Sequence, residues 1–513
     1  MAALLAMHAN PSARTYLTRL VGRVTQTSSS SSGVNQIRNM PIRPVRLGIN
    51  LAQVRYYSGE RAFANLAMGS RWQMLAPPRP IDVAALQRQE AALVGSNGEL
   101  RAAPSGGMAR ILTPPNGLGQ SVTIHCSYQG TGDVGVDSPT RSIAQVSGGK
   151  GAIGFTWQQS KGIVRIIVRS VASPIVGLDC RETSLAPSVR FAPAFVASLK
   201  PFRVVRFMDW ENTNANAAID WSNRHTASSI DVFDGGGVAI EDIVALSNAA
   251  RVDPWVTVPW NAGDDYVRRF AQMMHDGIPG DRPVYVEVAN EVWNWGFPVT
   301  RQASEEGLKA GLSTSGDDAF MLRYAQRTVE VMKIWTQVFR DRPSGLVRVI
   351  ASQNVLPQRA RKLLQAPELA DNIDAVASAP YFGLNPKNGP PKDVDGAFAE
   401  LDVALGQALD YARQYRAIAA SYGKRYIAYE AGQHVVIPDN VKLLEAIQRD
   451  DRMYSLYKRY LNSWRNNIGD TLTFYDSTAP INKFGAWGLV EYAGQPLSNA
   501  PKMRAVIEES NRR

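Results

Sequence analysis

The sequence predicts an α/β protein: a (β/α)8 TIM barrel with an inserted antiparallel β-rich domain after the first strand. Eight short apolar runs alternate with segments of helical spacing, as expected for a parallel sheet buried on both faces. No Gly-rich phosphate loop follows the first run, which favours a closed barrel over an open doubly wound sheet. A block rich in Gly, Ser and Thr separates the first run from the other seven.

The eight expected strands are short and almost continuously apolar. The first spans residues 46–50 and leads into a loop that carries aromatic side chains. The other seven follow the inserted block, at residues 203–208, 255–259, 284–288, 347–351, 375–379, 425–429 and 471–474. Between them, amphipathic spacing predicts helices over residues 265–275, 319–339, 395–422 and 441–464.

The inserted block has the texture of an antiparallel β domain. Its β-rich runs lie at residues 121–126, 152–157 and 163–171, and turn residues such as Gly148-Gly149 punctuate them. The chain therefore divides into a disordered Arg/Ser-rich leader (1–40), the first part of the barrel (41–90), the insert (91–182) and the remaining, catalytic part of the barrel (183–513). Cys126 and Cys180 lie in the insert and either pair, if the protein is exported, or remain buried thiols.

Charge and composition exclude several classes of protein. The formal net charge of the 513 residues is +10, but residues 1–59 hold seven arginines and no acid, which leaves +3 on the rest. A broad basic surface for nucleic acid is therefore not expected. No stretch approaches the roughly 18 apolar residues of a membrane-spanning helix. Two cysteines are too few for a disulfide scaffold or a four-cysteine zinc site.

The leader leaves the compartment open. Residues 1–38 are rich in Arg and Ser, contain no acid and include a serine run at 28–32. This composition is typical of a disordered leader and also of an organellar transit peptide. Export is a third reading, although the apolar run at residues 2–9 is short and lacks a charged segment before it.

Two strand ends carry carboxylates. Glu291 follows the fourth strand, and Glu430 ends the seventh. Chemistry in such barrels occurs at the C-terminal ends of strands, and glycosidic cleavage requires one protonated and one ionised carboxyl group in the same pocket. Either glutamate alone is more often a solvated surface group, so their joint placement carries the hypothesis. Strict alternation sends Asn290 and Glu291 to opposite faces, so a local bulge or turn is needed.

Other side chains near the strand ends suit a sugar better than a metal or a cofactor. The rigid apolar face of an aromatic ring matches the C–H surface of a sugar, and about half of the strand-end tryptophans are expected to pack in the core instead. These are Trp210, Trp260, Trp293 and Trp295. The five histidines lack metal-ligand spacing, and His434 is a neighbour of Glu430. We therefore expect no metal and no cofactor.

Three longer strings resemble a known family. Asn-Glu after the fourth strand and Glu at the end of the seventh resemble clan A of the retaining glycoside hydrolases, which are TIM barrels. The strings VYVEVANEVWNWGFP, RVVRFMDWENTN and AYEAGQH are similar to those of bacterial barrels described as cellulose-binding or cellulase-like proteins. Those barrels also carry a β-rich insertion after the first strand. The resemblance covers roughly residues 41–502.

The resemblance implies two catalytic roles and three supporting ones. Glu291 would be the general acid/base and Glu430 the nucleophile. Asn290 would hydrogen-bond the sugar hydroxyl next to the anomeric carbon. Tyr381 would hydrogen-bond the nucleophile, and Arg206 would keep it ionised.

The resemblance also implies a wider sugar-binding set. Trp487 would form the apolar floor beneath the sugar ring. The remaining candidates are Trp260, Trp293, Trp295, Asp209 and His434. Trp260 stands where many clan members carry a histidine, so the sequence departs from the clan pattern at this position. Alternatives to these roles stay open. In one, Arg206 pairs with Asp209 or Glu211 as a structural ion pair. In another, Tyr381 and Trp487 are ordinary core aromatics.

The expected function is that of a retaining O-glycosyl hydrolase that cleaves β-glycosidic bonds of a polysaccharide or oligosaccharide, β-glucan or cellulose-like. The alternative is a carbohydrate-binding protein with a weakly active or inactive barrel and the insert as a docking module. We expect a saccharide as the partner, no nucleic acid and a monomer. The resemblance implies an extracellular or periplasmic location.

Overall fold

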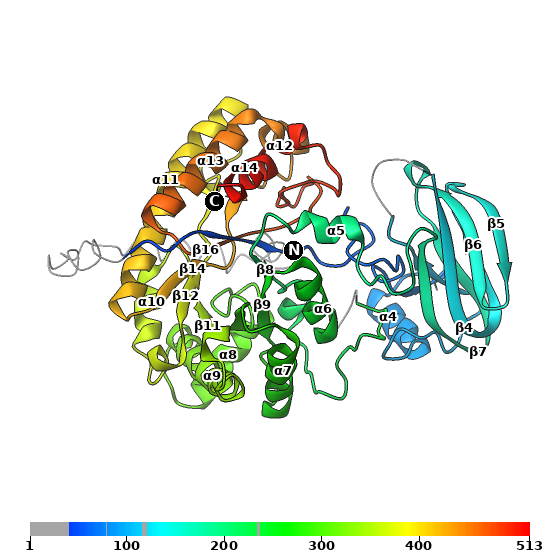
Figure 1. The fold of residues 1–513 in the computed structure, drawn as a ribbon, viewed down its shortest axis with the longest axis horizontal. Helices are drawn as coiled ribbons and strands as arrows, with labels where there is room; N and C mark the ends of the chain where they lie inside the picture. Colours follow the sequence, from blue (N-terminus) through cyan, green and yellow to red (C-terminus); the bar gives the residue numbers. More distant parts are fainter. Residues whose placement is uncertain (1–40, 78, 115–120, 233–235, 513) are drawn as a thin grey trace.

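The computed structural model describes residues 41–77, 79–114, 121–232 and 236–512, so the expected leader at 1–40 lies outside the described residues. Eight parallel strands close into a barrel ringed by helices, and a six-stranded antiparallel sheet projects from one side (Figure 1). The predicted fold class, a (β/α)8 barrel with an additional antiparallel sheet, is confirmed.

The barrel strands follow one another around the barrel in chain order. Each pairs in parallel with its neighbours, and β1 closes the barrel against the last strand with Arg46 opposite Thr471. Large rings such as Trp255 and Tyr285 fill the interior beside the small side chains of Ala375 and Ala377. The strands are β1 (Arg46–Asn50), β8 (Val204–Arg206), β9 (Asp253–Val258), β10 (Val284–Val288), β11 (Leu346–Ala351), β12 (Ala375–Ser378), β14 (Arg425–Ala428) and β16 (Thr471–Phe474).

Helices cover the outside of the barrel. They are α5 (Pro193–Ser198), α6 (Ile240–Ala250), α7 (Asp264–Gly277), α8 (Pro298–Lys309), α9 (Gly316–Val338), α10 (Pro357–Leu364), α11 (Val394–Ser421), α12 (Val441–Arg449), α13 (Asp451–Asn467) and α14 (Pro501–Ser510). The prediction of one helix over residues 441–464 is wrong. Asp450 has an extended backbone and its carboxylate accepts a hydrogen bond from the Arg452 N–H, so it caps a second helix.

The antiparallel sheet has the order β2-β3-β7-β4-β6-β5. Its strands are β2 (Trp72–Met74), β3 (Met108–Ile111), β4 (Ser121–Asp137), β5 (Ile143–Gly149), β6 (Ala152–Gln158) and β7 (Arg165–Glu182), and α4 (Val83–Leu93) connects the first two. The sheet thus begins upstream of the predicted boundary at residue 91, and the exact domain division stays a prediction. Because the insert leaves the barrel after β1, it emerges at the end where the strands present their carboxyl termini.

The two cysteines form a disulfide. Cys126 on β4 lies directly opposite Cys180 on β7, and their sulfur atoms are 2.07 Å apart. Both residues are fully buried. Of the two alternatives left open by the sequence, the structure contains the paired one.

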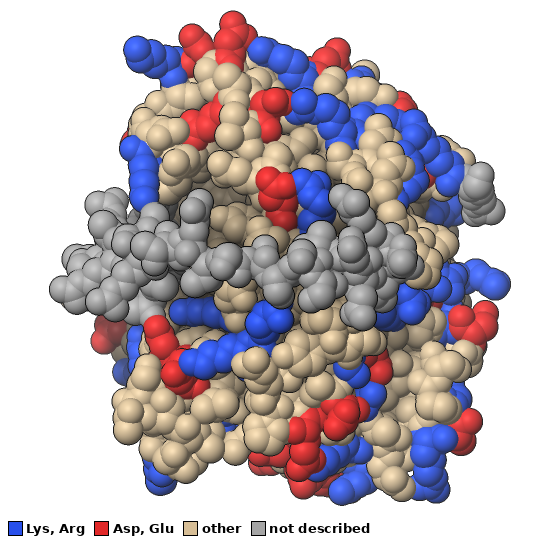
Figure 2. All heavy atoms as spheres, turned by 90° about the vertical axis from the view of Figure 1, so that its left-hand side faces the viewer, with Lys and Arg blue, Asp and Glu red and all other residues tan. Residues whose placement is uncertain are grey.

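The surface carries charges of both signs. On the face seen in Figure 2, Lys and Arg side chains recur beside Asp and Glu side chains. Many are paired, such as Arg425 with Asp470 and Arg452 with Asp395. This distribution agrees with the small net charge outside residues 1–59. Among the described helices, none is both long and apolar enough to cross a membrane.

Candidate active site

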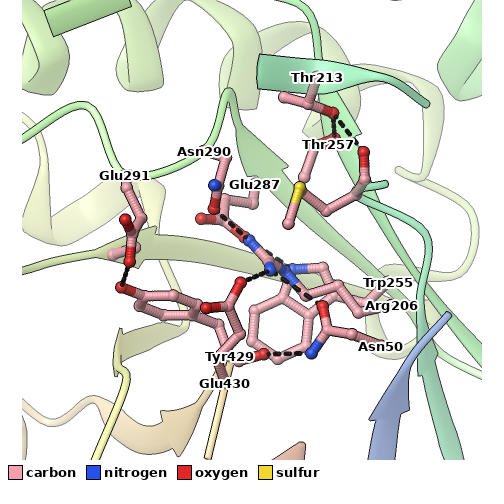
Figure 3. Close-up of polar contacts among 12 residues, drawn as sticks. Asn50, Arg206, Thr213, Trp255, Thr257, Glu287, Asn290, Glu291, Tyr429 and Glu430 are labelled. Carbon is pink, nitrogen blue, oxygen red and sulfur yellow. Dashed lines mark hydrogen bonds and ion pairs between the residues drawn. The ribbon is translucent and has the colours of Figure 1, made fainter. Parts of the chain in front are cut away.

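Arg206, on β8, is the hub of a polar network inside the barrel mouth (Figure 3). Its Nη1 donates to Glu430 Oε1 at 2.9 Å and to Asn50 Oδ1 at 3.1 Å. Its Nη2 donates to Asn290 Oδ1 at 2.9 Å and to Glu287 Oε2 at 3.0 Å, and Nε reaches the same Glu287 oxygen at 3.2 Å. These contacts use all the donors that a guanidinium has.

Arg206 is held as a charged group. It is fully buried, and its guanidinium carbon lies 5.6 Å from the ring centre of Trp255 and 5.0 Å from that of Tyr429. Burial acts to lower the pKa of Arg206, but the carboxylates of Glu287 and Glu430 outweigh it and raise that pKa above its ordinary value. The structure therefore gives Arg206 two carboxylate partners, neither of which is Asp209 or Glu211.

Glu430 lies two residues after the end of β14 and is buried. Besides Arg206 at one oxygen, it accepts a hydrogen bond from the Tyr381 hydroxyl at the other, at 3.0 Å. Burial and the nearby carboxylates of Glu291 and Asp209 raise the pKa of Glu430, whereas Arg206 and Tyr381 act to lower it.

Glu291 reaches the same mouth because the backbone leaves the strand conformation after β10. Ala289 and Glu291 have φ values of 55° and 45°, in the left-handed region that non-glycine residues seldom adopt. This breaks the alternation, so that Asn290 contacts Arg206 while Glu291 accepts a hydrogen bond from the Tyr429 hydroxyl at 2.7 Å. Such strained backbone is concentrated at functional sites.

The surroundings of the two carboxyl groups differ. Glu430 contacts a guanidinium, whereas Glu291 is held by neutral donors: the Tyr429 hydroxyl and the amide of Asn294, at 2.8 Å from its Oε2. Burial raises the pKa of Glu291, and the two donors act to lower it. A cation in direct contact stabilises an ionised carboxylate more than neutral donors do.

Four aromatic rings gather beside Glu430. Trp487, which is 7% exposed, lies 4.5 Å from His434, 6.1 Å from Tyr381 and 6.0 Å from Tyr475, measured between ring centres. Burial lowers the pKa of His434 to about 4, so the ring is neutral near pH 7. The Tyr475 hydroxyl donates a hydrogen bond to Asp209 Oδ2 at 3.1 Å, which links the cluster to the loop after β8.

The strand-end tryptophans are dispersed. Trp210 is buried beside Phe63, and Trp260 is buried with its Nε1 donating to Glu306 on α8 at 3.2 Å. Trp293 is half-buried against the barrel interior. Trp295 is 39% exposed and touches Phe320 edge-on. Trp210 and Trp260 are thus packing residues in this structure, and Trp295 presents the most ring surface.

Several members of the network were not identified from the sequence. They are Asn50, Trp255, Glu287, Asn294, Tyr429 and Tyr475. Glu287 did carry a signal, because it is the one charged residue in the apolar run 284–288. It is fully buried, its Oε2 also accepts from Trp255 Nε1 at 3.0 Å, and its Oε1 has no hydrogen-bond partner among the described residues. Burying a carboxylate is costly unless it is paired, so an acid inside an apolar strand points to a partner such as Arg206.

The described part of the chain contains no group of three or more His, Cys, Asp or Glu side chains arranged to hold a metal ion. The donors around Glu291 and Glu430 are an arginine, amides and phenols. Such donors can bind hydroxyl groups and stabilise a carboxylate.

No family model matches the sequence, and no curated protein matches it. Solved structures that match include a GH51 arabinofuranosidase from Xanthomonas axonopodis pv. citri, at 11% identity and a TM-score of 0.38, over 58% of this chain and 62% of that one. A CBM22-1–GH10 xylanase complexed with xylohexaose, from Clostridium thermocellum, matches at 12% identity and a TM-score of 0.36, over 89% of this chain and 98% of that one. A family 1 β-glucosidase from Thermotoga maritima matches at 11% identity and a TM-score of 0.33, over 62% of this chain and 85% of that one.

The likeness is one of fold. At 11–12% identity and TM-scores below 0.4, it assigns no family to the chain. The match spans about three fifths of the arabinofuranosidase, and the roles of individual residues rest on the geometry described above.

Proposed function

We propose that the chain is a retaining glycoside hydrolase that cleaves β-glycosidic bonds of a polysaccharide or oligosaccharide of the β-glucan type. The observation that carries this proposal is the meeting of Glu291 and Glu430, from the ends of β10 and β14, in one network in which Arg206 contacts Glu430. Retaining cleavage needs two carboxyl groups with different proton affinities.

In this mechanism Glu430 attacks the anomeric carbon. The glycosidic bond breaks, its oxygen takes the proton of Glu291, and the sugar is left as an ester of Glu430. Glu291, now ionised, takes a proton from water, and the resulting hydroxide displaces Glu430 from the anomeric carbon. Both enzyme groups return to their initial state, and the sugar keeps its configuration.

The contacts support this division of roles. When two buried carboxyl groups share a site, repulsion keeps one of them protonated. Arg206 stabilises the ionised form of Glu430, so the retained proton belongs on Glu291. Asn290 is fixed by Arg206 and by Asn214, to which it donates at 3.0 Å, and is held ready for a sugar hydroxyl.

A second candidate function is carbohydrate binding with little or no turnover. It is favoured by one observation: both oxygens of Glu291 accept hydrogen bonds, from Tyr429 and Asn294. Donors at both oxygens favour the ionised form and compete with the proton that a general acid must supply.

In the carbohydrate-binding alternative, the insert serves as a docking module. In the described part of residues 91–182, Phe155 and Trp157 are buried and Tyr128 is partly buried against the core. The insert therefore lacks a well-exposed aromatic platform there, and we assign sugar binding to the barrel. The Cys126–Cys180 disulfide supports an extracellular or periplasmic location for the protein, which we propose to act as a monomer.

The test uses aryl β-glycosides with a good leaving group and sodium azide. The parent should hydrolyse at least one member of a panel of glucosides, xylosides, galactosides and mannosides. With Glu291→Ala, the ester should form but persist, and azide should restore turnover and yield a glycosyl azide of retained configuration. With Glu430→Gly, azide should give the inverted product. Equal configurations from the two variants would refute the roles, and no turnover by the parent would favour the binding alternative.

A further inference from the structure

A hollow of about 580 Å³ lies where the barrel meets the insert. Its walls are α5, the loop after β16, the start of α14 and Glu182, the last residue of β7. Figure 1 shows α5 between α14 and the antiparallel sheet. Among the described residues that line the hollow, none belongs to the network around Arg206. Its volume is typical of pockets that bind small organic ligands.

Most of the wall is apolar. Phe195 and Leu199 line the hollow at α5, and Leu489 and Met503 line it from the C-terminal part of the chain. Leu497 also lines it and is 43% exposed, so the hollow leaves apolar surface uncovered. An occupant with an apolar body would remove this surface from water, which is favourable.

The charged residues of the wall leave an excess of negative charge. They are Glu60, Arg61 and Glu182, two carboxylates and one guanidinium. Arg61 Nη1 is bound to Glu182. Its Nε and Nη2 donate to the carbonyl oxygens of Phe63 and Ala64, each at 3.3 Å. The guanidinium therefore has its own partners, and within the described part of the chain no ion pair is formed by Glu60.

The side-chain partners of Glu60 are neutral hydroxyl groups. Its Oε1 accepts from Ser477 at 3.0 Å and from Thr478 at 2.9 Å, whereas Oε2 has only a 3.3 Å contact with the same Ser477 hydroxyl. A hydroxyl has one proton, so Ser477 cannot satisfy both oxygens, and Oε2 keeps capacity for a further donor. Burial raises the pKa of Glu60 to about 7, although the two hydroxyl groups act to lower it. A carboxyl that no cation faces shows such a rise.

The apolar wall and the carboxyl without a cation together define the chemistry of an occupant. An ammonium group can donate to Oε2 of Glu60 and supplies the opposite charge, while a hydrocarbon body covers the apolar wall. A carboxylate or phosphate would be repelled by the excess negative charge. A neutral sugar would leave Glu60 without a cation.

We propose that the hollow between α5, α14 and the insert is a binding site for a small amphiphilic amine, whose ammonium group pairs with Glu60 and whose apolar part packs on α5 and the C-terminal segment. The site is separate from the proposed glycosidase function, because it uses neither carboxyl group of the proposed catalytic pair.

The first test compares three probes with a phenylalkyl body and different head groups: 4-phenylbutylamine, 4-phenylbutanol and 4-phenylbutanoate. Dissociation constants would be measured by ligand-observed NMR at pH 8, above the pKa of Glu60, where its carboxyl is mostly ionised. The amine should bind about tenfold or more tightly than the alcohol, because a hydrogen bond to a charged partner is stronger than a neutral one. The carboxylate should bind more weakly than the alcohol. Glu60→Gln removes the charge but keeps an acceptor for the two hydroxyl groups, and it should bring the amine and the alcohol within about twofold of each other.

A second variant tests where the probes bind. Ala194 is exposed on α5 and lines the hollow, so the large ring of Ala194→Trp should fill it and weaken binding of the amine and the alcohol about tenfold or more. Ala197→Trp is the matched control, because Ala197 is exposed on the same helix and does not line the hollow. It should change neither affinity. Circular dichroism would confirm that all variants are folded.

Three results would overturn the proposal. Binding of the amine no tighter than that of the alcohol, or tightest binding of the carboxylate, would show that Glu60 does not select a cation. No binding of the amine at about 10 mM would exclude the site. An amine affinity that Ala194→Trp leaves unchanged would place the amine elsewhere on the protein. Hydrolysis of glycosides enters none of these measurements, so a failure of the proposed function would leave this test intact.

Discussion

Arg206 shows how much one side chain contributes to this site. The five N–H donors of its planar guanidinium bond to Asn50, Glu287, Asn290 and Glu430. Lysine keeps the charge but presents a compact ammonium with three donors on a flexible stem, so it cannot make the same contacts. The network therefore needs arginine in particular.

The first prediction follows from this geometry. Arg206→Lys should lower kcat about 100-fold, or about 3 kcal/mol in the barrier, because Glu430 and Asn290 lose their fixed positions. Steady-state kinetics on an aryl glycoside would measure it, with circular dichroism to confirm folding. Arg449→Lys, at an exposed ion pair with Glu491, is the control and should retain full activity. A near-parental kcat for Arg206→Lys would remove Arg206 from the mechanism.

We predict that Glu287 acts through its neighbours, as a positioning residue. Its charge is one of the causes that raise the pKa of Glu291, so removing that charge should lower the pKa of Glu291. In a bell-shaped profile of kcat/KM the basic limb reports the proposed general acid, Glu291. Glu287→Gln should therefore move the basic limb to lower pH. A merely structural role predicts lower activity at every pH with both limbs in place, and that outcome would contradict this assignment.

Glu211 provides a prediction about stability. Burial raises its pKa to about 8, although Thr257 donates to its Oε2 from both its backbone N–H (2.8 Å) and its hydroxyl (2.6 Å). A carboxyl with a raised pKa holds its proton in the folded state after the unfolded chain has lost it. The protonated Glu211 therefore contributes to the free energy of unfolding. This contribution is complete below the unfolded pKa of about 4.5 and is lost as the pH rises through 8.

Glu211→Gln should remove this loss. At pH 9 the free energy of unfolding should rise by about 5 kcal/mol, the equivalent of about 3.5 pKa units, and at pH 5 it should change little. Urea denaturation at the two pH values measures the difference, with Glu305→Gln on the exposed face of α8 as the control. A gain of the same size at both pH values would show that the carboxyl is not the cause.

Among the elements, the barrel strands are the part of the fold best predicted from sequence. Their apolar runs are local, and β10 and β16 have the bounds that the pattern indicates. The three-residue strand β2 was missed because Trp72–Met74 is too short for any alternation to show. Asp450 was read as part of one helix because the helices on both sides of it are amphipathic.

The strand pair β4–β7 gives a prediction at this scale. Its disulfide closes a loop of 54 residues, and such a loop corresponds to about 4 kcal/mol in the chain-entropy account. Replacing Cys126 and Cys180 together by Ser should lower the melting temperature of the insert by several degrees. Hydrolysis of an aryl glycoside should stay within about twofold, because the proposed site lies in the barrel. Dithiothreitol should lower the melting temperature of the parent only. An equal shift in the double variant would contradict the assignment of this stability to the disulfide.

At the scale of the whole molecule, barrel closure assembles the site. The amide of Asn50 donates to the carbonyl oxygens of Tyr429 and Phe474, which lie 379 and 424 residues later in the chain. The two glutamates could be predicted because each ends a strand and carries a local motif. Asn50, Tyr429 and Tyr475 could not, because their roles depend on contacts that exist only when the first and last strands pair.

The central claim is that Glu430 forms a covalent ester with the sugar. The most direct measurement is mass spectrometry of the protein after incubation with 2,4-dinitrophenyl 2-deoxy-2-fluoro-β-glycosides of the gluco and xylo series. Fluorine slows both steps, while the good leaving group keeps formation of the ester faster than its hydrolysis. The protein should gain the mass of one sugar, on the tryptic peptide 426–442, whose single glutamate is Glu430. Glu430→Gln should gain none. A label on Glu291 or elsewhere, or turnover of aryl glycosides with no label at all, would contradict the account.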